Sequence, residues 1–373
     1  MKILIVIGTR PEAIKMAPVI INLQKNKKIK IKLCVTAQHR KMLDDVLGLF
    51  DLKPDFDLNI MKQNQSLFQL TSNILLKFEN VLELYKPDMT LVHGDTTTTM
   101  VISLACYYKK IPLAHVEAGL RTNNIFSPWP EEANRKITDL LSNIHFAPVS
   151  SSKKNLIKEN ISKKNIFLTG NTVIDALFNA KKIITKNKLI KKKLEKKYNF
   201  LNKKKIILTT IHRRENFGKG ITEVCRSLIK ISSINDVQII FPVHLNPNIR
   251  EKVNKLLFGY KNIFLIDPVD YANMIYLMNK SYMIITDSGG IQEEAPSLNK
   301  PLVIVRDFTE RPEIIKLGGG ILVRRDSNKI YNIVNKIINN EKIYNKMANI
   351  KNPYGDGKAS NKIIKTIKDF LNY

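Results

Sequence analysis

The stretch from Tyr282 to Pro296, YMIITDSGGIQEEAP, decides the fold. It begins with an apolar run, MIIT at 283–286, which meets a turn, DSGG at 287–290. The next residues, IQEEA, have the composition of a helix and contain no glycine. The pattern therefore predicts a strand, a tight loop and a helix.

A loop of this kind can bind an anion. The first N–H groups of a helix have no partner within it and carry the positive end of its dipole. Ser288, Gly289 and Gly290 would let an anion approach the backbone closely. Glu294 lies about one turn into the helix, where its carboxylate can accept hydrogen bonds from two sugar hydroxyls. This pairing indicates a nucleotide ligand; the alternative is that Asp287 or Ser288 caps a helix and the glycines only turn the chain.

The same order of apolar run, polar loop and helical stretch recurs along the chain. Helical patterns separate the runs, so the strands should be parallel and buried on both faces. Because 373 residues exceed what one hydrophobic core usually organises, we expect two domains. We therefore predict an α/β fold of two Rossmann-like doubly wound domains facing a cleft. The predicted strands are residues 3–7, 31–35, 89–92, 111–116, 205–210, 238–243, 262–266, 283–286 and 302–305.

The composition argues against several classes of protein. Hydrophobic residues make up 44% of the chain, but no apolar run approaches the roughly 20 residues of a membrane span. The first residues enter a strand pattern directly, so we expect no signal peptide. The three cysteines, Cys34, Cys106 and Cys225, lack CxxC spacing, which indicates neither a disulfide framework nor a zinc site. We expect a cytoplasmic protein with no metal centre and no membrane partner.

The formal net charge of +28 raises nucleic acid as a partner. The lysines cluster in short runs, such as 191–193 and 203–205, among abundant Asn and Ile and without interleaved aromatic residues. The candidate ligand loops contain little lysine. We interpret the excess charge as a property of the solvated surface and expect no nucleic-acid partner. A basic RNA-binding protein is the non-enzymatic alternative.

Charged side chains follow the predicted strands at the edge where such sheets bind ligands. Arg10 and Lys15 stand where the first strand passes into a helix, and both are candidate phosphate contacts. Asp95 and Glu117 follow two later strands. Taken singly, an acidic residue at such a position is more often a helix cap or a loop acceptor. The loop after the first strand lacks the GxGxxG fingerprint of a dinucleotide cofactor.

The stretch 127–135, SPWPEEANR, places two prolines around the only tryptophan and then two carboxylates at a helix N-terminus. The helix dipole alone would account for acidic residues there. However, Asp95, Glu117 and Glu131 at one edge would concentrate negative charge, which is costly unless a proton or a cationic ligand group offsets it. We predict that acid–base chemistry takes place at this edge.

Six motifs in order carry a specific resemblance to a known family. They are GTRPE at 8–12, HGDTTT at 93–98, HVEAGLR at 115–121, PEEANR at 130–135, HRREN at 212–216 and DSGGIQEE at 287–294. With these motifs the chain resembles the non-hydrolysing UDP-N-acetylglucosamine 2-epimerases of bacteria from Met1 to about Ala359. The resemblance implies a glycosyltransferase-B-like pair of domains, 1–175 with a C-terminal helix 360–373 that crosses back, and 176–359. It also implies a homodimer.

The resemblance assigns roles to particular residues. Asp95, Glu117 and Glu131 match the proposed acid–base residues of the family, and His212 joins them in the catalytic set. Glu294 matches the ribose contact. Together with Lys15, predicted from its place at the strand-to-helix junction, the full set of predicted UDP-sugar contacts is Arg10, Lys15, Ser288, Gly289, Gly290, Glu294 and Arg311.

The chain also departs from the family pattern. Some members place an aromatic residue near the uracil and a glutamine beside it, where this chain has Met274 and Val269. Some members bind a second substrate molecule as an allosteric activator. The match to that site is partial: Gln38, Glu131, Arg213 and His244 agree with it, whereas Lys41 and Asn64 replace its usual Gln and Arg.

The implied reaction interconverts UDP-N-acetylglucosamine and UDP-N-acetylmannosamine, without a cofactor, for bacterial surface polysaccharides. The proton on carbon 2 is not acidic, because the sugar has no adjacent carbonyl. Elimination of UDP would acidify it and give a 2-acetamidoglucal, and re-addition would give the epimer. A UDP-sugar glycosyltransferase of the same fold and a hydrolysing epimerase are the alternative enzymes.

Overall fold

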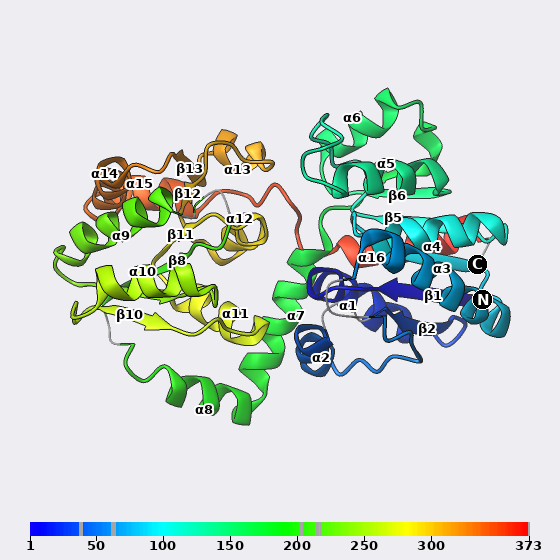
Figure 1. The fold of residues 1–373 in the computed structure, drawn as a ribbon, viewed down its shortest axis with the longest axis horizontal. Helices are drawn as coiled ribbons and strands as arrows, with labels where there is room; N and C mark the ends of the chain where they lie inside the picture. The colour runs from blue at the N-terminus through cyan, green and yellow to red at the C-terminus, as the bar shows by residue number, and fades with distance from the viewer. Residues whose placement is uncertain (37–39, 61–64, 202–203, 214–215, 217, 372–373) are drawn as a thin grey trace. The chain divides into compact units, whose positions relative to one another are not determined.

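The computed structural model describes residues 1–36, 40–60, 65–201, 204–213, 216 and 218–371. The chain forms two compact units, which we call unit 1 (Met1–Asn179 with Tyr354–Tyr373) and unit 2 (Ala180–Pro353) (Figure 1). No helix in the described ranges is long and apolar enough to cross a membrane.

Unit 1 is built on a seven-stranded sheet with the order β3-β2-β1-β4-β5-β6-β7. Every neighbouring pair of strands is parallel, as the sequence predicts. The strands are β1 (Lys2–Ile7), β2 (Lys30–Val35), β3 (Phe56–Asp57), β4 (Met89–His93), β5 (Leu113–Val116), β6 (Ile144–Ala147) and β7 (Ile166–Leu168).

Unit 2 repeats this architecture with a six-stranded sheet in the order β10-β9-β8-β11-β12-β13, also parallel throughout. The predicted strand 283–286 is confirmed as β11, at the centre of this sheet. The strands are β8 (Lys205–Thr210), β9 (Val237–Pro242), β10 (Ile263–Ile266), β11 (Met283–Thr286), β12 (Leu302–Val305) and β13 (Gly320–Val323).

Helices connect the strands, and together with the sheets they make both units α/β. In unit 1 they are α1 (Arg10–Gln24), α2 (Arg40–Leu49), α3 (Leu67–Tyr85), α4 (Thr97–Tyr108), α5 (Glu131–Leu141), α6 (Ser150–Lys158), η1 (Lys163–Asn165) and α16 (Ala359–Phe370); α7 (Thr172–Lys186) leads into unit 2. In unit 2 they are α8 (Lys188–Lys197), α9 (Lys219–Ser232), α10 (Pro247–Leu257), α11 (Tyr271–Lys280), α12 (Gly289–Glu294), η3 (Ala295–Leu298), α13 (Pro312–Lys316), α14 (Ser327–Ile338) and α15 (Glu341–Ala348).

The central strands are buried on both faces. Residues 3–7 of β1 are at most 1% exposed. Leu4 and Val6 join the core under α3 and α4, and alternation along the strand points Ile3, Ile5 and Ile7 to the opposite face. A strand covered on both sides must be apolar at every position, which is why its sequence shows a continuous run.

The C-terminal helix α16 belongs to unit 1, as predicted, although about half of the chain separates it from the rest of that unit. It packs beside α1 (Figure 1). Asp175 holds its first turn, because its carboxylate accepts hydrogen bonds from the backbone N–H of Ser360 at 2.9 Å and from its hydroxyl at 2.6 Å.

Each sheet reverses its winding once, and these switch points fix where polar loops gather. In unit 1 the order reverses between β1 and β4, and in unit 2 between β8 and β11. Ligands of doubly wound sheets bind beyond the carboxyl ends of the strands at such points. The loops after these strands carry Arg10, Asp95, His212 and Ser288, all of which belong to the predicted site.

Candidate active site

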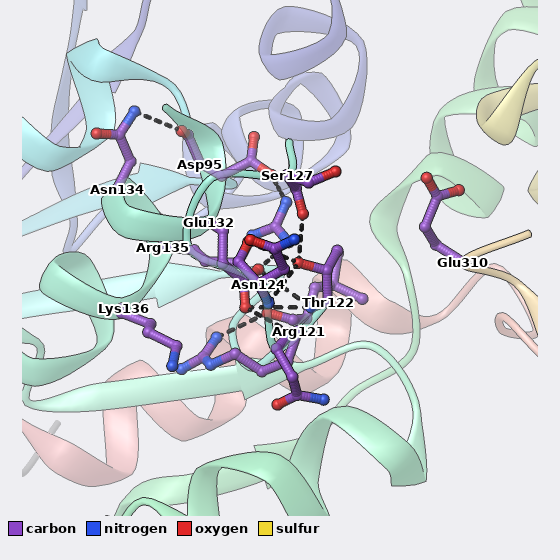
Figure 2. Close-up of polar contacts among 12 residues, drawn as sticks. Asp95, Arg121, Thr122, Asn124, Ser127, Glu132, Asn134, Arg135, Lys136 and Glu310 are labelled. Carbon is purple, nitrogen blue, oxygen red and sulfur yellow. Dashed lines mark hydrogen bonds and ion pairs between the residues drawn. The ribbon is translucent and has the colours of Figure 1, made fainter. Parts of the chain in front are cut away.

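Asp95 lies in the loop after β4 and is braced from α5. Its carboxylate forms an ion pair with Arg135, whose guanidinium also donates to Glu132 at 2.7 Å (Figure 2). The side-chain amide of Asn134 donates to the backbone carbonyl of Asp95 at 3.0 Å. The Asp95 side chain keeps 31% of its surface exposed, so it is held in place while still open to a ligand.

Glu117 follows β5 in a backbone conformation that is unusual for its residue type. Its φ of 67° lies in the left-handed region, which costs energy for a residue with a side chain. Its carboxylate is paired with the ammonium of Lys15 and accepts a hydrogen bond from the Asn171 amide at 2.9 Å. Strain of this kind persists where the surroundings over-determine it, and it clusters at functional sites.

The neighbour of Glu117 in β4 is a neutral histidine. His93 Nε2 lies 3.8 Å from Glu117 Oε2, too far for a hydrogen bond. Burial lowers the pKa of His93 to about 3, so its imidazole is uncharged near neutral pH. Of these two neighbours, Lys15 is therefore the cation that contacts Glu117. The sequence presented Lys15 as a phosphate contact, and the structure brings it to the Glu117 carboxylate.

Two adjacent carboxylates begin α5, and they differ in their contacts. Glu132 is fully buried and accepts hydrogen bonds from Arg135 and from the backbone N–H groups of Thr122 and Asn123, both at 3.1 Å. Glu131, in contrast, has a buried Oε2 atom with no hydrogen-bond partner in the described ranges. Glu132 braces the loop, whereas Glu131 retains an oxygen that can take up a proton.

Glu12 joins the two segments of unit 1 that follow β1 and β4. Its carboxylate accepts hydrogen bonds from the N–H groups of Gly8 and Thr9, at 3.0 and 2.6 Å, and from the hydroxyls of Thr96 and Thr99, at 2.8 and 3.1 Å. Arg10 and Asp95 both neighbour these contacts in the chain. The sequence motif contained Glu12, but its role was missed because its partners in α4 lie more than 80 residues away.

In unit 2, Asp287 braces the loops rather than capping a helix. It is fully buried and accepts hydrogen bonds from the backbone N–H groups of His212 and Arg213, at 3.0 and 2.9 Å, and from the Asn216 amide at 2.8 Å. Burial alone would raise the pKa of Asp287. Hydrogen bonds from the His212 side chain, the Arg213 backbone and the Asn216 side chain hold that pKa below its usual value. Ser288 occupies the N-cap of α12 without a side-chain cap hydrogen bond. The capping alternative is therefore wrong for Asp287, whereas Ser288 stands at the N-cap position but its side chain does not make the cap hydrogen bond.

Arg311 lies against the glycine loop. A Cβ atom at Gly289 would come within 3.0 Å of the Arg311 guanidinium carbon, so only glycine fits there without displacing the arginine. Arg311 Nε donates to Glu293 at 2.9 Å. The structure thus brings together an arginine and the N-terminus of α12, two groups that both attract an anion.

Glu294 and Arg213 also have partners that the sequence did not reveal. The Glu294 carboxylate accepts a hydrogen bond from the Tyr271 hydroxyl at 2.7 Å and is 5% exposed. Arg213 lies 3.7 Å from Glu310, which makes a two-pronged ion pair with Arg306 at 2.6 and 3.1 Å.

Several residues of the suggested allosteric site cannot be placed. Gln38 and Asn64 lie outside the described residues, as does the side chain of Lys41. His244 is exposed after β9, and its Nδ1 accepts a hydrogen bond from the Asn246 N–H at 3.1 Å. Val269 and Met274 are both partly buried. Val269 lies just before α11, and Met274 lies within its first turns.

Two doubly wound units with polar loops at their switch points define the glycosyltransferase-B-like class. A glycosyltransferase from Rickettsia africae ESF-5 shares this fold, with a TM-score of 0.64 over 99% of this chain and 98% of its own, at 15% identity. The family model for UDP-N-acetylglucosamine 2-epimerase matches residues 21–368, and the chain belongs to that family.

Individual relatives confirm the resemblance found in the sequence. A UDP-N-acetylglucosamine 2-epimerase from Campylobacter jejuni is 53% identical over 369 residues, covering 97% of this chain and 96% of that one. One from Escherichia coli K12 is 50% identical, with 99% of both chains covered. The crystal structure of UDP-GlcNAc 2-epimerase from Neisseria meningitidis bound to UDP-GlcNAc has a TM-score of 0.92 at 51% identity, covering 99% of this chain and all of that one.

Proposed function

We propose that this enzyme interconverts UDP-N-acetylglucosamine and UDP-N-acetylmannosamine by inverting carbon 2, without releasing free sugar. The observation that carries the proposal is the full-length similarity to the Neisseria meningitidis epimerase, whose crystal structure contains UDP-GlcNAc. The reaction needs carboxylates that move a proton and groups that bind a diphosphate. The acidic loops of unit 1, which carry Asp95 and Glu117, and the start of α5, with Glu131, supply the carboxylates. The glycine loop of unit 2, residues 287–290, supplies the anion-binding groups.

The nucleotide would bind at the switch point of unit 2. The N-terminus of α12 (Ser288, Gly289 and Gly290) would hold the diphosphate together with Arg311, and Glu294 the ribose. The position of Arg311 supports this assignment, because its guanidinium carbon lies 3.0 Å from the place where a Cβ atom on Gly289 would stand. Arg10 and Lys15 of unit 1, and His212 of unit 2, complete the set of proposed substrate contacts.

The reaction would proceed by elimination and re-addition. A carboxylate takes the proton from carbon 2, the electron pair of that C–H bond forms the double bond to carbon 1, and the bond from carbon 1 to the UDP oxygen breaks. The products of this step are 2-acetamidoglucal and UDP, held together in the site. UDP adds back to carbon 1 while a proton reaches the opposite face of carbon 2. Cationic groups around the diphosphate stabilise the leaving group as its charge develops.

The three carboxylates would divide this work. We assign direct proton transfer to Asp95 and Glu131 and a supporting role to Glu117, with His212 acting on the sugar side. The exposure of the two side chains supports the assignment, because Asp95 keeps 31% of its surface open to a substrate and Glu117 only 10%. The hydrogen-bond acceptor left open on Glu131 supports it as well.

We further propose that two copies of the chain associate through an apolar face of unit 1. Helix α3 packs beside α4, and α4 beside α5. Leu76 and Leu84 on α3, Tyr107 on α4 and Leu140 on α5 are each more than 60% exposed. Light scattering would give the mass: we expect a dimer, and a monomer for Leu84→Glu with Leu140→Glu. Phe258→Glu, at an exposed apolar residue of unit 2, is the control that should stay dimeric.

Other parts of the proposal follow from the family resemblance. We propose that the enzyme works in the cytoplasm, supplies precursors of surface polysaccharides, and folds as the domains 1–175 with 360–373 and 176–359. Activation by a second substrate molecule at Gln38, Arg213 and His244 is also proposed. Because Lys41 and Asn64 replace the usual Gln and Arg, we expect a weaker activation than in some relatives.

One experiment tests the central proposal. The purified protein is incubated with UDP-N-acetylglucosamine in deuterated water, without nicotinamide or metal, and the sugar is followed by proton NMR. Deuterium at carbon 2 together with UDP-N-acetylmannosamine is the expected result. Release of free sugar and UDP would indicate a hydrolysing enzyme instead, and unchanged substrate would favour a glycosyltransferase that needs an acceptor.

A further inference from the structure

A fully buried histidine in β5 connects the two acidic loops of unit 1. His115 is 0% exposed. Its Nδ1 lies 2.6 Å from Oδ1 of Asp139 in α5, and its Nε2 lies 2.7 Å from the backbone carbonyl oxygen of Gly94. Gly94 immediately precedes Asp95. The imidazole therefore spans the distance between a buried carboxylate and the loop that carries a proposed catalytic residue.

The other oxygen of Asp139 reaches the second acidic loop. Asp139 Oδ2 accepts hydrogen bonds from the N–H of Gly119 at 3.2 Å and from the Arg121 guanidinium at 2.7 Å. Gly119 follows Glu117 by two residues. A continuous chain of contacts thus runs from the Asp95 loop through His115 and Asp139 to the Glu117 loop.

Both ring nitrogens of His115 face acceptors. A backbone carbonyl oxygen can only accept, and an ionised carboxylate can only accept. The carboxylate of Asp139 is ionised, because contacts with His115 and Arg121 outweigh the effect of burial and hold its pKa below the usual value. Each nitrogen must then donate a proton for both contacts to be hydrogen bonds. The two hydrogen bonds therefore require an imidazole ring with a proton on each nitrogen.

Both loops contain left-handed backbone positions, which cost little at glycine but are unfavourable at Glu117. Gly94 and Gly119 have φ angles of 71° and 84°, and Glu117 itself has a φ of 67°. A Cβ atom at Gly119 would lie 2.4 Å from the backbone oxygen of Ser152, so this loop is also closely packed. Contacts that fix Gly94 and Gly119 fix the positions from which Asp95 and Glu117 project.

We propose that His115, held by Asp139, is a positioning residue that sets the spacing between the Asp95 and Glu117 carboxylates. It cannot be a catalytic residue, since it is fully buried and its Nε2 meets a carbonyl rather than a nucleophile. The inference rests on the proposed epimerase function, because the spacing matters only if both carboxylates act on one substrate. A misplacement of about 1 Å at a reacting group can cost roughly 100-fold in rate.

The chain offers a matched set of variants. The amide nitrogen of Asn can occupy the place of the histidine Nδ1, and that of Gln the place of Nε2. His115→Asn should therefore keep the contact with Asp139 and lose the one with Gly94, whereas His115→Gln should keep a donor for Gly94. His145→Gln is the control, because His145 pairs with His115 across adjacent strands and is equally buried. Its Nε2 lies 2.7 Å from the backbone oxygen of Asp139, a contact that reaches neither the Asp95 loop nor the Glu117 loop.

The test compares kcat, KM and thermal unfolding across the wild type and the three variants. We expect His115→Asn to lower kcat by about 10- to 100-fold with KM little changed. His115→Gln should recover part of that loss, and His145→Gln should lower the unfolding temperature with kcat within about twofold of the wild type. Nitrogen-15 NMR of the wild-type ring should show both His115 nitrogens protonated.

The outcomes separate the inference from the proposed function. Absence of epimerisation by the wild type would overturn the proposed function and this inference with it. An active wild type whose kcat falls equally in His115→Asn and His145→Gln would overturn the inference alone. So would a wild-type spectrum with only one protonated nitrogen on His115, a result that needs no variant to fold.

Discussion

Asp95 and Asp287 occupy equivalent places in the two units and do different work. Each follows the strand beside the switch point, β4 in unit 1 and β11 in unit 2. Asp95 is 31% exposed and pairs with one arginine, whereas Asp287 is 0% exposed and accepts hydrogen bonds from two loop N–H groups and an amide. Topology brings both carboxylates to the ligand edge, but burial and the number of donors decide which one remains available to a substrate.

The largest expected effect is on turnover through Asp95. Asp95→Asn keeps the size and the contact with Arg135 but cannot accept a proton, so kcat should fall by about 10²- to 10⁴-fold. Steady-state assays of both reaction directions would measure this. The unfolding free energy should change by less than about 1 kcal/mol, because the residue is partly exposed. Near-normal turnover would remove Asp95 from the catalytic set.

For Asp287 we expect a large effect on stability, unlike the small one expected for Asp95. Asp287→Ala leaves the N–H groups of His212 and Arg213 and the amide of Asn216 without their buried acceptor, which should lower the unfolding free energy by about 3 kcal/mol. Urea unfolding followed by fluorescence and circular dichroism would report the loss. Asp95→Ala is the matched control. Equal stability losses in the two variants would show that Asp95 and Asp287 contribute equally to stability.

The glycine loop of unit 2 offers a finer test. Gly289→Ala should push Arg311 aside and weaken UDP binding by about tenfold, or about 1.4 kcal/mol. Isothermal titration with UDP would measure it. Gly290→Ala is the comparison, because a Cβ atom there meets nothing within 4 Å and leaves Arg311 in place. A larger loss from Gly290→Ala would mean that close approach of the phosphate, rather than Arg311, governs affinity.

The smallest expected effect concerns acid stability in unit 2. Although burial opposes it, the hydrogen bond from Arg306 and nearby charges lower the pKa of Glu310 from 4.5 to about 2. A depressed pKa contributes stability above pH 4.5 that is lost as the pH falls towards about 2.

Glu310→Gln should remove that contribution. Because Glu310 is partly exposed, we expect it to be on the order of 1 kcal/mol after solvent screening. The measurement is the difference in unfolding free energy between wild type and variant across this pH range. A difference that stays constant with pH would show that Glu310 keeps its ordinary pKa.

Most strands could be predicted from the sequence, and the exceptions share a physical cause. The continuous apolar runs in β1, β8 and β11 mark strands buried on both faces. Four strands were missed. β3 and β7, with two and three residues, are too short to show a period, whereas β6 carries the buried His145 and β13 begins with Gly320, which shortens the apolar run of each. Only pairing with neighbouring strands makes such segments strands.

The candidate site could likewise be predicted from the sequence only in part. Six motifs in order indicate the family, and from them Asp95, Glu117, Glu131 and Ser288 are predicted as site residues. The residues that hold these groups did not stand out, because their contacts are distant in sequence. Arg135 lies 40 residues from Asp95, and Tyr271 lies 23 residues from Glu294.

The two parallel sheets, the order of the polar loops and the family follow from the sequence alone. These features depend on local patterns: apolar runs, turn residues and short motifs. The fold in three dimensions was needed to show that Asp287 braces the scaffold, that Lys15 pairs with Glu117, and that His115 and Asp139 connect the Asp95 and Glu117 loops. A side chain's protonation and freedom depend on burial and on which donors surround it, and folding alone brings those partners together.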